Sequence, residues 1–250
     1  MPTMSFECRI LSTLACSVIF LASLAGCAKR ETVAEAGIRT QTLHISNGAE
    51  PADLDPQIVT AYTDMNVMVA LFEGLTTLDE ATAKPEPGVA KSWETSPDGM
   101  VWTFHLQPNA KWSNGDPVTA KDFVYSYQRI LSPKLASEYS YMLWPLKNGQ
   151  EYNEGKITDF GQVGVRALDD LTLQLNLAYP CPWLLAITAH QSWFPVHRAT
   201  IEKFGAIDDK GTRWTRTENI VSNGPFKLKE WTPNARLVAV RNPYYWDAAR

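Results

Sequence analysis

Large apolar residues alternate with smaller or polar ones most regularly in two runs near the middle of the chain. From Trp102 to Leu106 every second residue is large and apolar, and from Leu171 to Leu177 every second residue is a leucine. Successive side chains of a β-strand point to opposite faces, so each run predicts a strand with one buried face and one freer face. The turns Ser96–Gly99 and Asp169-Asp170 precede them.

A helical pattern follows the first strand. Thr119 can act as the N-cap, with Asp122 three residues later as its reciprocal partner. The apolar positions then repeat along one helix face: Phe123, Tyr127, Ile130 and Leu131. Polar residues, Ser126 and Arg129 among them, mostly take the other side. The pattern predicts an amphipathic helix that ends at Ser132-Pro133, because proline disfavours helical backbone in the residue before it.

Weaker patterns predict further elements on both sides of this region. Residues 43–46 form a short strand that leads into a loop rich in breakers. Thr63 can cap a helix whose apolar stripe continues to Phe72. Later in the chain, residues 226–231 and 236–241 predict a β-hairpin.

The beginning of the chain has the pattern of an exported lipoprotein. The apolar run 10–25 is shorter than the roughly 20 residues that span a bilayer. It ends in Leu-Ala-Gly-Cys27, which resembles the lipobox of bacterial lipoproteins and implies cleavage before Cys27 and lipidation of its thiol. We interpret residues 1–26 as a lipoprotein signal peptide and residues 27–42 as a lipid-anchored tether. A buried N-terminal helix is the alternative.

Composition narrows the classes of function. Of the 250 residues, 45% are hydrophobic and 11% aromatic, which is enough for a sizeable core in one or two domains. Acidic residues outnumber basic ones by 27 to 23, and no basic stripe runs among the aromatic residues, so nucleic acid is not an expected partner. Cys181, the only cysteine in the body of the chain, is expected to be a small buried residue and not a nucleophile.

The sequence contains no recognisable motif for catalysis, a cofactor or a metal. Nucleophile elbows, HExxH pairs and glycine-rich phosphate loops do not occur, and the histidines are too dispersed for a zinc site. We therefore expect no enzyme, no cofactor and no metal. Most of the nine tryptophans, including Trp183, are expected in the core. Four have positions that leave a cleft-facing role open: Trp112, Trp144, Trp193 and Trp214.

The order of turns, aromatic residues and helix between Trp93 and Leu131 closely resembles one protein family. In bacterial extracellular solute-binding proteins that serve peptide importers of the ATP-binding-cassette (ABC) type, above all the oligopeptide-binding branch, the elements W…SPDG…WTFHL…AKWS(N/D)G.PVTA.DFVYS(W/Y)QR recur in this order and spacing. The segments IVSNGPF (220–226) and NPYYW (242–246) continue the resemblance. It extends from about Leu43 to the last residue.

The resemblance implies an α/β fold of the periplasmic-binding-protein type, class II and extended with an extra domain, of which this chain is the N-terminal half. A domain I with a mixed sheet would combine residues 43–72 with residues 197–250. Residues 73–196 would form an inserted α+β domain II. Full members of the family are longer, so we expect the chain to be truncated and the opposing lobe to be missing.

The resemblance also implies a function: capture of an oligopeptide in the cleft between lobes by a lipid-anchored monomer, in the periplasm or at the outer face of the cell membrane. Delivery would be to the ABC permease and ATPase complex of the inner membrane. Relatives hold an extended peptide by main-chain hydrogen bonds, which every peptide can form whatever its sequence.

The matching motifs carry four residues over to the peptide site. They align the backbone of Thr60, Ala61 and Tyr62 with a strand that flanks the peptide, and Tyr139 with an aromatic residue that contacts it. Some relatives have an acidic residue at the position of Thr60, so a charge contact made there is absent here. An ordinary packed tyrosine is the alternative for Tyr139.

Other functions fit the same scaffold, because the site and not the fold decides the ligand. One alternative is a receptor for a different small solute, such as a dipeptide, a sugar, haem or nickel. Another is a surface lipoprotein without a role in transport. A peptidase is the enzymatic alternative, and it would have to hydrolyse a labelled peptide.

Overall fold

The computed structural model describes residues 31–43 and 47–249, which divide into two units after Thr40. The first unit contains helix α2 (Val33–Thr40), so the predicted tether includes a helix. The helix begins with a capping box, in which the Thr32 hydroxyl accepts the N–H of Glu35 and the Glu35 carboxylate accepts the N–H of Thr32. The predicted signal peptide and Cys27 lie outside the described residues.

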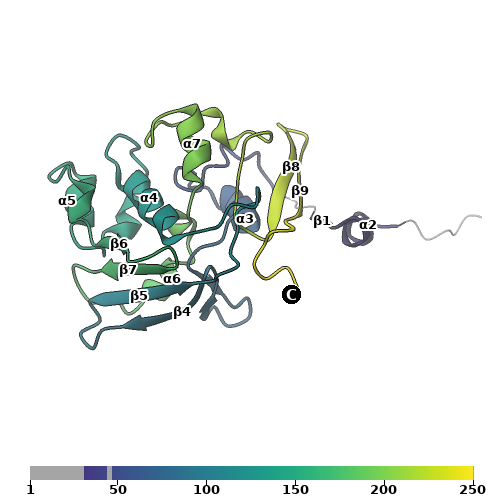
Figure 1. Cartoon of the computed structure of the whole chain (residues 1–250). Coiled ribbons are helices and arrows are strands. Elements are labelled where there is room, and N and C mark those ends of the chain that lie inside the picture. Colours follow the sequence, from purple (N-terminus) through teal and green to yellow (C-terminus); the bar gives the residue numbers. More distant parts are fainter. Residues whose placement is uncertain (1–30, 44–46, 250) are drawn as a thin grey trace, which may run out of the picture. The chain divides into compact units, whose positions relative to one another are not determined.

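The largest sheet of the second unit has four antiparallel strands (Figure 1). Their order is β4 (Ala90–Thr95), β5 (Val101–Leu106), β7 (Thr172–Asn176) and β6 (Val165–Ala167). Phe104 on β5 lies opposite Trp93 on one side and Leu173 on the other, so apolar residues form continuous cross-strand rows. The two strands predicted from alternating residues, β5 and β7, are confirmed.

Helix α4 (Ala120–Leu131) packs against β6 and β7. The Asp122 carboxylate accepts the N–H of Thr119 at 2.7 Å and its hydroxyl at 2.9 Å, which confirms the predicted N-terminal cap. The other side of the helix differs from the prediction. Ser126 and Arg129, which the amphipathic pattern places on the polar side, are both fully buried.

A smaller sheet joins two distant segments of the chain. It has the order β1 (Thr42–Leu43), β9 (Arg236–Arg241) and β8 (Phe226–Thr232), and the predicted hairpin is confirmed as β8 and β9. The remaining pair, β2 (Thr76–Leu78) and β3 (Pro85–Pro87), is also antiparallel. The expected mixed sheet is therefore not found among the described strands. The tight turn between β8 and β9 requires antiparallel pairing, since parallel strands need a long crossover.

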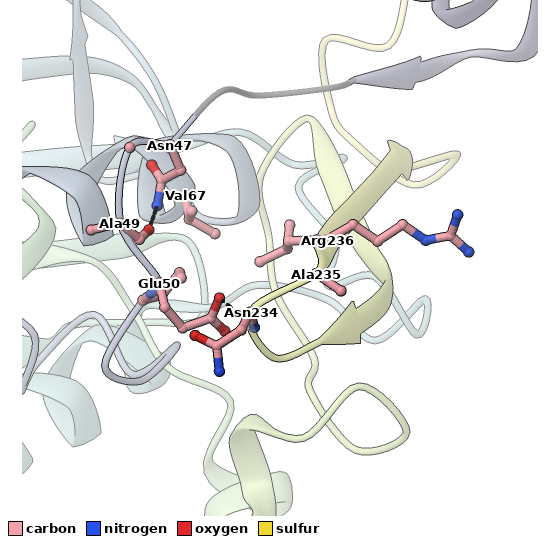
Figure 2. A pocket seen from close by; sticks show the side chains of 10 residues that line it. Asn47, Ala49, Glu50, Val67, Asn234, Ala235 and Arg236 are labelled. Carbon is pink, nitrogen blue, oxygen red and sulfur yellow. Dashed lines mark hydrogen bonds between the residues drawn. The ribbon is translucent and has the colours of Figure 1, made fainter.

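The loop that follows β1 is tied to the turn of this hairpin (Figure 2). The Glu50 carboxylate accepts a hydrogen bond from the Trp231 indole at 2.6 Å and another from the Asn234 backbone N–H at 2.9 Å. Asn234 has a φ of 59°, a left-handed conformation that asparagine tolerates better than most residues. The Glu50 carboxylate thus connects the loop both to strand β8 and to the turn of the hairpin.

Helix α3 (Tyr62–Leu71) begins one residue earlier than the proposed cap, Thr63. Ala61 is the N-cap, and its carbonyl accepts the N–H groups of both Asp64 and Met65. Thr63 lies inside the first turn, so the prediction of its capping role is wrong. The other helices are shorter: α5 (Gly149–Asn153), α6 (Leu184–Ile187) and α7 (Arg198–Phe204).

The end of α3 is tied to the segment before β8. The Gly224 N–H donates to the Leu71 carbonyl at 2.8 Å, and the Asn223 side chain bonds both the N–H and the carbonyl of Glu73, at 3.1 and 2.9 Å. A Cβ atom on Gly224 would lie 2.6 Å from the Leu71 backbone. Only glycine fits this close approach.

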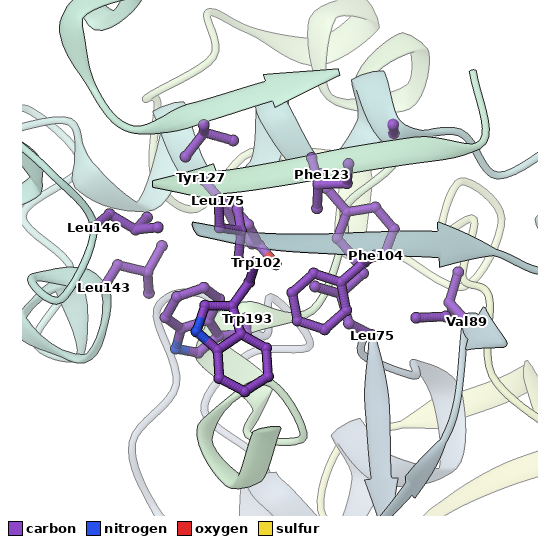
Figure 3. Packing of buried hydrophobic residues seen from close by; sticks show 14 of the residues in the cluster. Leu75, Val89, Trp102, Phe104, Phe123, Tyr127, Leu143, Leu146, Leu175 and Trp193 are labelled. Carbon is purple, nitrogen blue, oxygen red and sulfur yellow. The ribbon is translucent and has the colours of Figure 1, made fainter. Parts of the chain in front are cut away.

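Buried apolar residues form two clusters. The first cluster contains residues between Leu75 and Trp193, and Figure 3 shows Phe104, Leu175 and Trp193 packing within it. The second cluster combines residues of 54–72 and 194–239 with Tyr125 of α4. The clusters resemble the predicted division at residues 72/73 and 196/197. Residues 41 onward nevertheless form one compact unit, so the domain boundaries stay a prediction.

The tryptophans differ from the prediction in both directions. Trp112, Trp193 and Trp214 are at most 1% exposed, so they belong to the core and face no cleft. Trp183, which the sequence pattern predicts in the core, is 56% exposed. Trp144 is half-buried against the first cluster, and its indole donates to the Asn153 side chain at 3.2 Å. Tertiary packing, and not the local pattern, decides the exposure of these side chains.

Candidate functional site

The loop before α3 is anchored by a buried arginine. The Arg129 guanidinium of α4 donates to both carboxylate oxygens of Asp55, at 2.6 and 3.1 Å, and to the Gln57 side-chain oxygen at 2.8 Å. The side chains of Arg129 and Asp55 are 0% and 2% exposed. A bidentate pair of this kind has one well-defined geometry, so it fixes the position of the loop relative to α4.

Further hydrogen bonds hold the same loop from other sides. The Gln57 amide donates to the Ser126 carbonyl at 2.8 Å, and the Gln57 carbonyl accepts the Ser137 hydroxyl at 2.6 Å. The Gln191 amide donates to the Val59 carbonyl at 2.6 Å. The loop is therefore rigid up to Val59, where the chain reaches the surface.

The next three residues, Thr60, Ala61 and Tyr62, are exposed, and the side chain of Tyr62 is 78% exposed. Their backbone N–H groups donate to none of the described residues. Ala61 has an extended conformation, with φ of −75° and ψ of 146°. A loop held by these hydrogen bonds thus presents open backbone donors around the extended residue Ala61, just before α3 begins, and open donors are a requirement for binding a second strand.

Tyr139 lies directly beside this backbone. Its hydroxyl donates to the Thr60 carbonyl at 3.2 Å, although the two residues are 79 positions apart in the chain. Its ring packs edge to face on His190, with centroids 5.1 Å apart, and against Tyr141 at 6.2 Å. Two of the four predicted residues are therefore in contact, and Ala61 and Tyr62 continue the chain from one of them.

His190 is a part of this arrangement that the sequence did not reveal. Its Nδ1 accepts the Ser192 N–H at 3.2 Å, which leaves the proton of the neutral ring on Nε2. Burial lowers the pKa of His190 below its ordinary value, so the ring is neutral at pH 7. Spacing gives no signal for His190, because its contact with Tyr139 depends on the packing of two distant turns.

A second buried acid lies outside this site. The Glu73 carboxylate accepts hydrogen bonds from the Tyr245 hydroxyl and the Trp246 indole, each at 2.5 Å. Burial raises its pKa to about 7, and the two hydrogen bonds only partly oppose the shift. Glu73 and Tyr245 line a cavity of about 150 Å³. These contacts join the end of α3 to the C-terminal segment.

A larger pocket, of about 390 Å³, lies between residues 47–51 and the hairpin residues 234–237 (Figure 2). None of the four predicted peptide-binding residues lines it. Within the described part of the chain, no group of three or more His, Cys, Asp or Glu residues could hold a metal ion. Cys181 is a buried free thiol, and burial raises its pKa. No helix of residues 31–43 and 47–249 is long and apolar enough to cross a membrane.

Comparison with known sequences identifies relatives of this chain. The family model for "Bacterial extracellular solute-binding proteins, family 5 Middle" matches residues 84–250. The periplasmic oligopeptide-binding protein OppA of Salmonella typhimurium is 45% identical over 214 residues, which cover 84% of this chain and 37% of the relative. The periplasmic murein peptide-binding protein MppA of Escherichia coli is 41% identical over 80% of this chain and 36% of its own length.

Solved structures give the same result. Haemophilus influenzae OppA in complex with the peptide RPPGFSPFR superimposes with a TM-score of 0.76 at 40% identity, over 81% of this chain and 38% of that protein. The α/β fold of periplasmic binding proteins is thereby confirmed. The chain spans between a third and two fifths of the length of the relatives it matches.

Proposed function

The chain belongs to the bacterial extracellular solute-binding proteins of family 5, and we propose on this basis that it binds oligopeptides by their main chain and delivers them to an ABC permease and its ATPase. The family is defined by solute binding, which favours a receptor over the peptidase alternative. The relatives named for oligopeptides and murein peptides favour peptides over other solutes.

One observation carries the proposal: the exposed backbone of Thr60, Ala61 and Tyr62, which is extended at Ala61, has N–H groups that donate to none of the described residues. A peptide laid beside this segment can accept those donors with its own carbonyls. The segment does not have to reorder for binding, because the loop before it is held by the Arg129 pair with Asp55. Binding to a pre-organised backbone avoids the entropy cost of ordering a loop.

The side chains around this backbone suit a receptor of broad specificity. Tyr139 lies beside Thr60, the rings of Tyr141 and His190 pack against Tyr139, and Tyr141 is 50% exposed. Aromatic faces pack against many kinds of side chain. Because burial keeps His190 neutral at pH 7, its ring adds no positive charge to this aromatic group. Selectivity then depends mainly on the peptide backbone.

The same proposal includes location and domain structure. The relatives are named as periplasmic proteins, which supports export of this chain. Lipidation of Cys27 and the tether that follows it are part of the proposal and rest on the lipobox alone. We also propose that residues 43–72 and 197–250 form one domain and that residues 73–196 form a second, inserted one.

The first test is a chemical-shift titration of the isotope-labelled chain with alanine tripeptide and with other tripeptides of unrelated sequence. We expect the backbone amides of residues 60–62 and the ring of Tyr139 to shift first. We also expect affinities that agree within about tenfold, since main-chain bonds ignore side chains. A tripeptide with N-methylated amides should bind more weakly. Shifts confined to another region, or none at all, would refute the proposal.

A matched pair of variants tests the backbone donors. Ala61→Pro removes one N–H at a φ of −75°, which proline adopts without strain. Ala61→Ser keeps the N–H. We expect the proline variant to bind peptide about fivefold more weakly, the effect of one hydrogen bond, and the serine variant to bind like the parent chain. Equal affinities of the two variants would contradict a role for this donor.

A further inference from the structure

A groove runs along helix α4. One wall consists of helix positions Lys121, Val124 and Tyr125, which lie on one face of α4. Phe160, Arg166 of strand β6 and Arg198 at the start of α7 complete it. The groove has a volume of about 500 Å³, which is within the size range of small-molecule sites.

The charged residues of the groove are all positive. Lys121, Arg166 and Arg198 line it, and no carboxylate is among its described lining residues, although the whole chain has a net charge of −4. Lys121 pairs with Asp170 and Arg198 with Glu202, but these ion pairs are exposed, so water screens them. The local charge therefore favours an anion.

Apart from Gln128, the remaining lining residues are apolar or aromatic. The Tyr125 ring lies 5.5 Å below the Arg198 guanidinium, and Val124 and Phe160 are partly buried beside the first cluster. Burial raises the pKa of Tyr125 to about 12, so its hydroxyl brings no negative charge to the groove at neutral pH. An apolar surface with cations at its rim matches a ligand that has an apolar body and an acidic group.

Arg166 also disfavours one other kind of ligand, a peptide strand. Strand β6 is an edge of the four-stranded sheet, where a peptide could add as a further strand. The Arg166 guanidinium already donates to the carbonyls of Val163 and Val165, at 2.7 and 2.6 Å. These bonds compete with strand addition at this edge.

We propose that this groove binds a small amphiphilic anion, with its flat apolar body on Val124 and Phe160 and its acidic group between Arg166 and Arg198. None of Thr60, Ala61, Tyr62 and Tyr139 lines the groove. The site is therefore separate from the proposed peptide site, and the two can be tested independently.

Two dyes of the same shape provide the test on the full chain. Anilinonaphthalenesulfonate has a sulfonate on an aromatic body, and phenylnaphthylamine has the same body without charge. Fluorescence titration should show the sulfonate binding at least about tenfold more tightly, a difference of about 1.4 kcal/mol. Added salt should reduce the difference. Equal binding of both dyes would overturn the proposal.

A charge placed in the groove locates the site. Val124→Glu puts a carboxylate on the groove wall, and Val124→Gln is a control of the same shape without the charge. We expect the glutamate variant to bind the sulfonate dye at least about tenfold more weakly than the glutamine variant, through charge repulsion at short range. Similar affinities of the two variants would overturn the proposal.

A second pair does not depend on the fold tolerating a change at Val124. Arg198→Gln removes a rim cation, whereas Arg216→Gln removes an exposed arginine outside the groove. Only the first should weaken the sulfonate dye, and neither should change binding of the uncharged one. Displacement of the dye by alanine tripeptide would place it at the peptide site and would also refute the proposal.

Discussion

The first cluster is drawn from one continuous region of chain, between Leu75 and Trp193, whereas the second collects its residues from separate segments. Apolar cross-strand rows and one face of α4 account for the first. The second includes buried polar connections as well. Arg129 reaches from α4 to Asp55 and Gln57 and lies 5.8 Å from the Trp214 ring.

The difference shows how a single chain can use two means of assembly. Apolar burial is non-directional, so a local alternating pattern is enough to form the sheet of the first cluster. Segments that are distant in the chain have no such pattern to align them. Directional bonds between buried charged groups supply a unique geometry, at the cost of removing those groups from water. The proposed peptide site lies where the second mechanism operates.

The largest effect should come from breaking the buried ion pair. Arg129→Met leaves the Asp55 carboxylate buried without its partner, and we expect the free energy of unfolding to fall by about 4 kcal/mol. Urea denaturation measures this. The double variant Arg129→Met, Asp55→Asn should recover part of the loss, because no uncompensated charge remains.

The same variant also tests whether the ion pair positions the loop, independently of its effect on stability. At temperatures where Arg129→Met is folded, the amide signals of residues 60–62 should shift, since the loop before them has lost its anchor. Unchanged signals would mean that the ion pair does not position the site.

The next effect should come from the first cluster and should leave the site unchanged. Leu173→Ala removes a fully buried side chain from β7, and we expect a loss of about 3.5 kcal/mol through lost burial and a residual cavity. The signals of residues 60–62 and Tyr139 should keep their positions. A shift there as large as that caused by Arg129→Met would remove the contrast between the two clusters.

The smallest effect concerns pH. The pKa of Glu73 is about 7 in the folded protein and 4.5 ordinarily, so the fold favours the protonated acid. Its stabilising contribution is complete below pH 4.5 and is lost as the pH rises to 7, by at most about 3 kcal/mol. Glu73→Gln should flatten this slope in unfolding experiments between pH 4.5 and 8.

The comparison with the parent chain is necessary because two histidines also make the stability depend on pH. Burial lowers the pKa values of His190 and His197, so their contributions are lost as the pH falls, the opposite direction. The difference between Glu73→Gln and the parent chain cancels them, because both proteins keep the histidines. If the two pH profiles run parallel, Glu73 does not titrate in this range.

The sequence predicted the elements whose cause is local. The alternation of β5 and β7, the cap at Thr119 and the β8–β9 hairpin all follow from residues within one short segment. The helix pattern predicts the wrong side for Arg129, because the cause of its burial is not local. An arginine on the polar face of an amphipathic helix is normally solvated. Its burial is favourable here because it pairs with Asp55, which is 74 residues away in the chain.

The candidate site was predicted only in part. Thr60 and Tyr139 came from the resemblance to a family, and no residue pattern indicated that they touch. His190 and Gln191 were missed, because a ring contact and a single side-chain bond to the Val59 carbonyl leave no periodic signal. We predict that the four named residues bind peptide, and the titration with tripeptides tests this.

The contact between the end of α3 and the Asn223-Gly224 turn has a consequence for biosynthesis. Its two halves are separated by 150 residues, so the earlier half leaves the ribosome long before the later one exists. The residues of the first cluster have all emerged by Trp193, and that sheet can form during translation. The apolar side of α3 that packs against β8 stays uncovered until β8 has been synthesised.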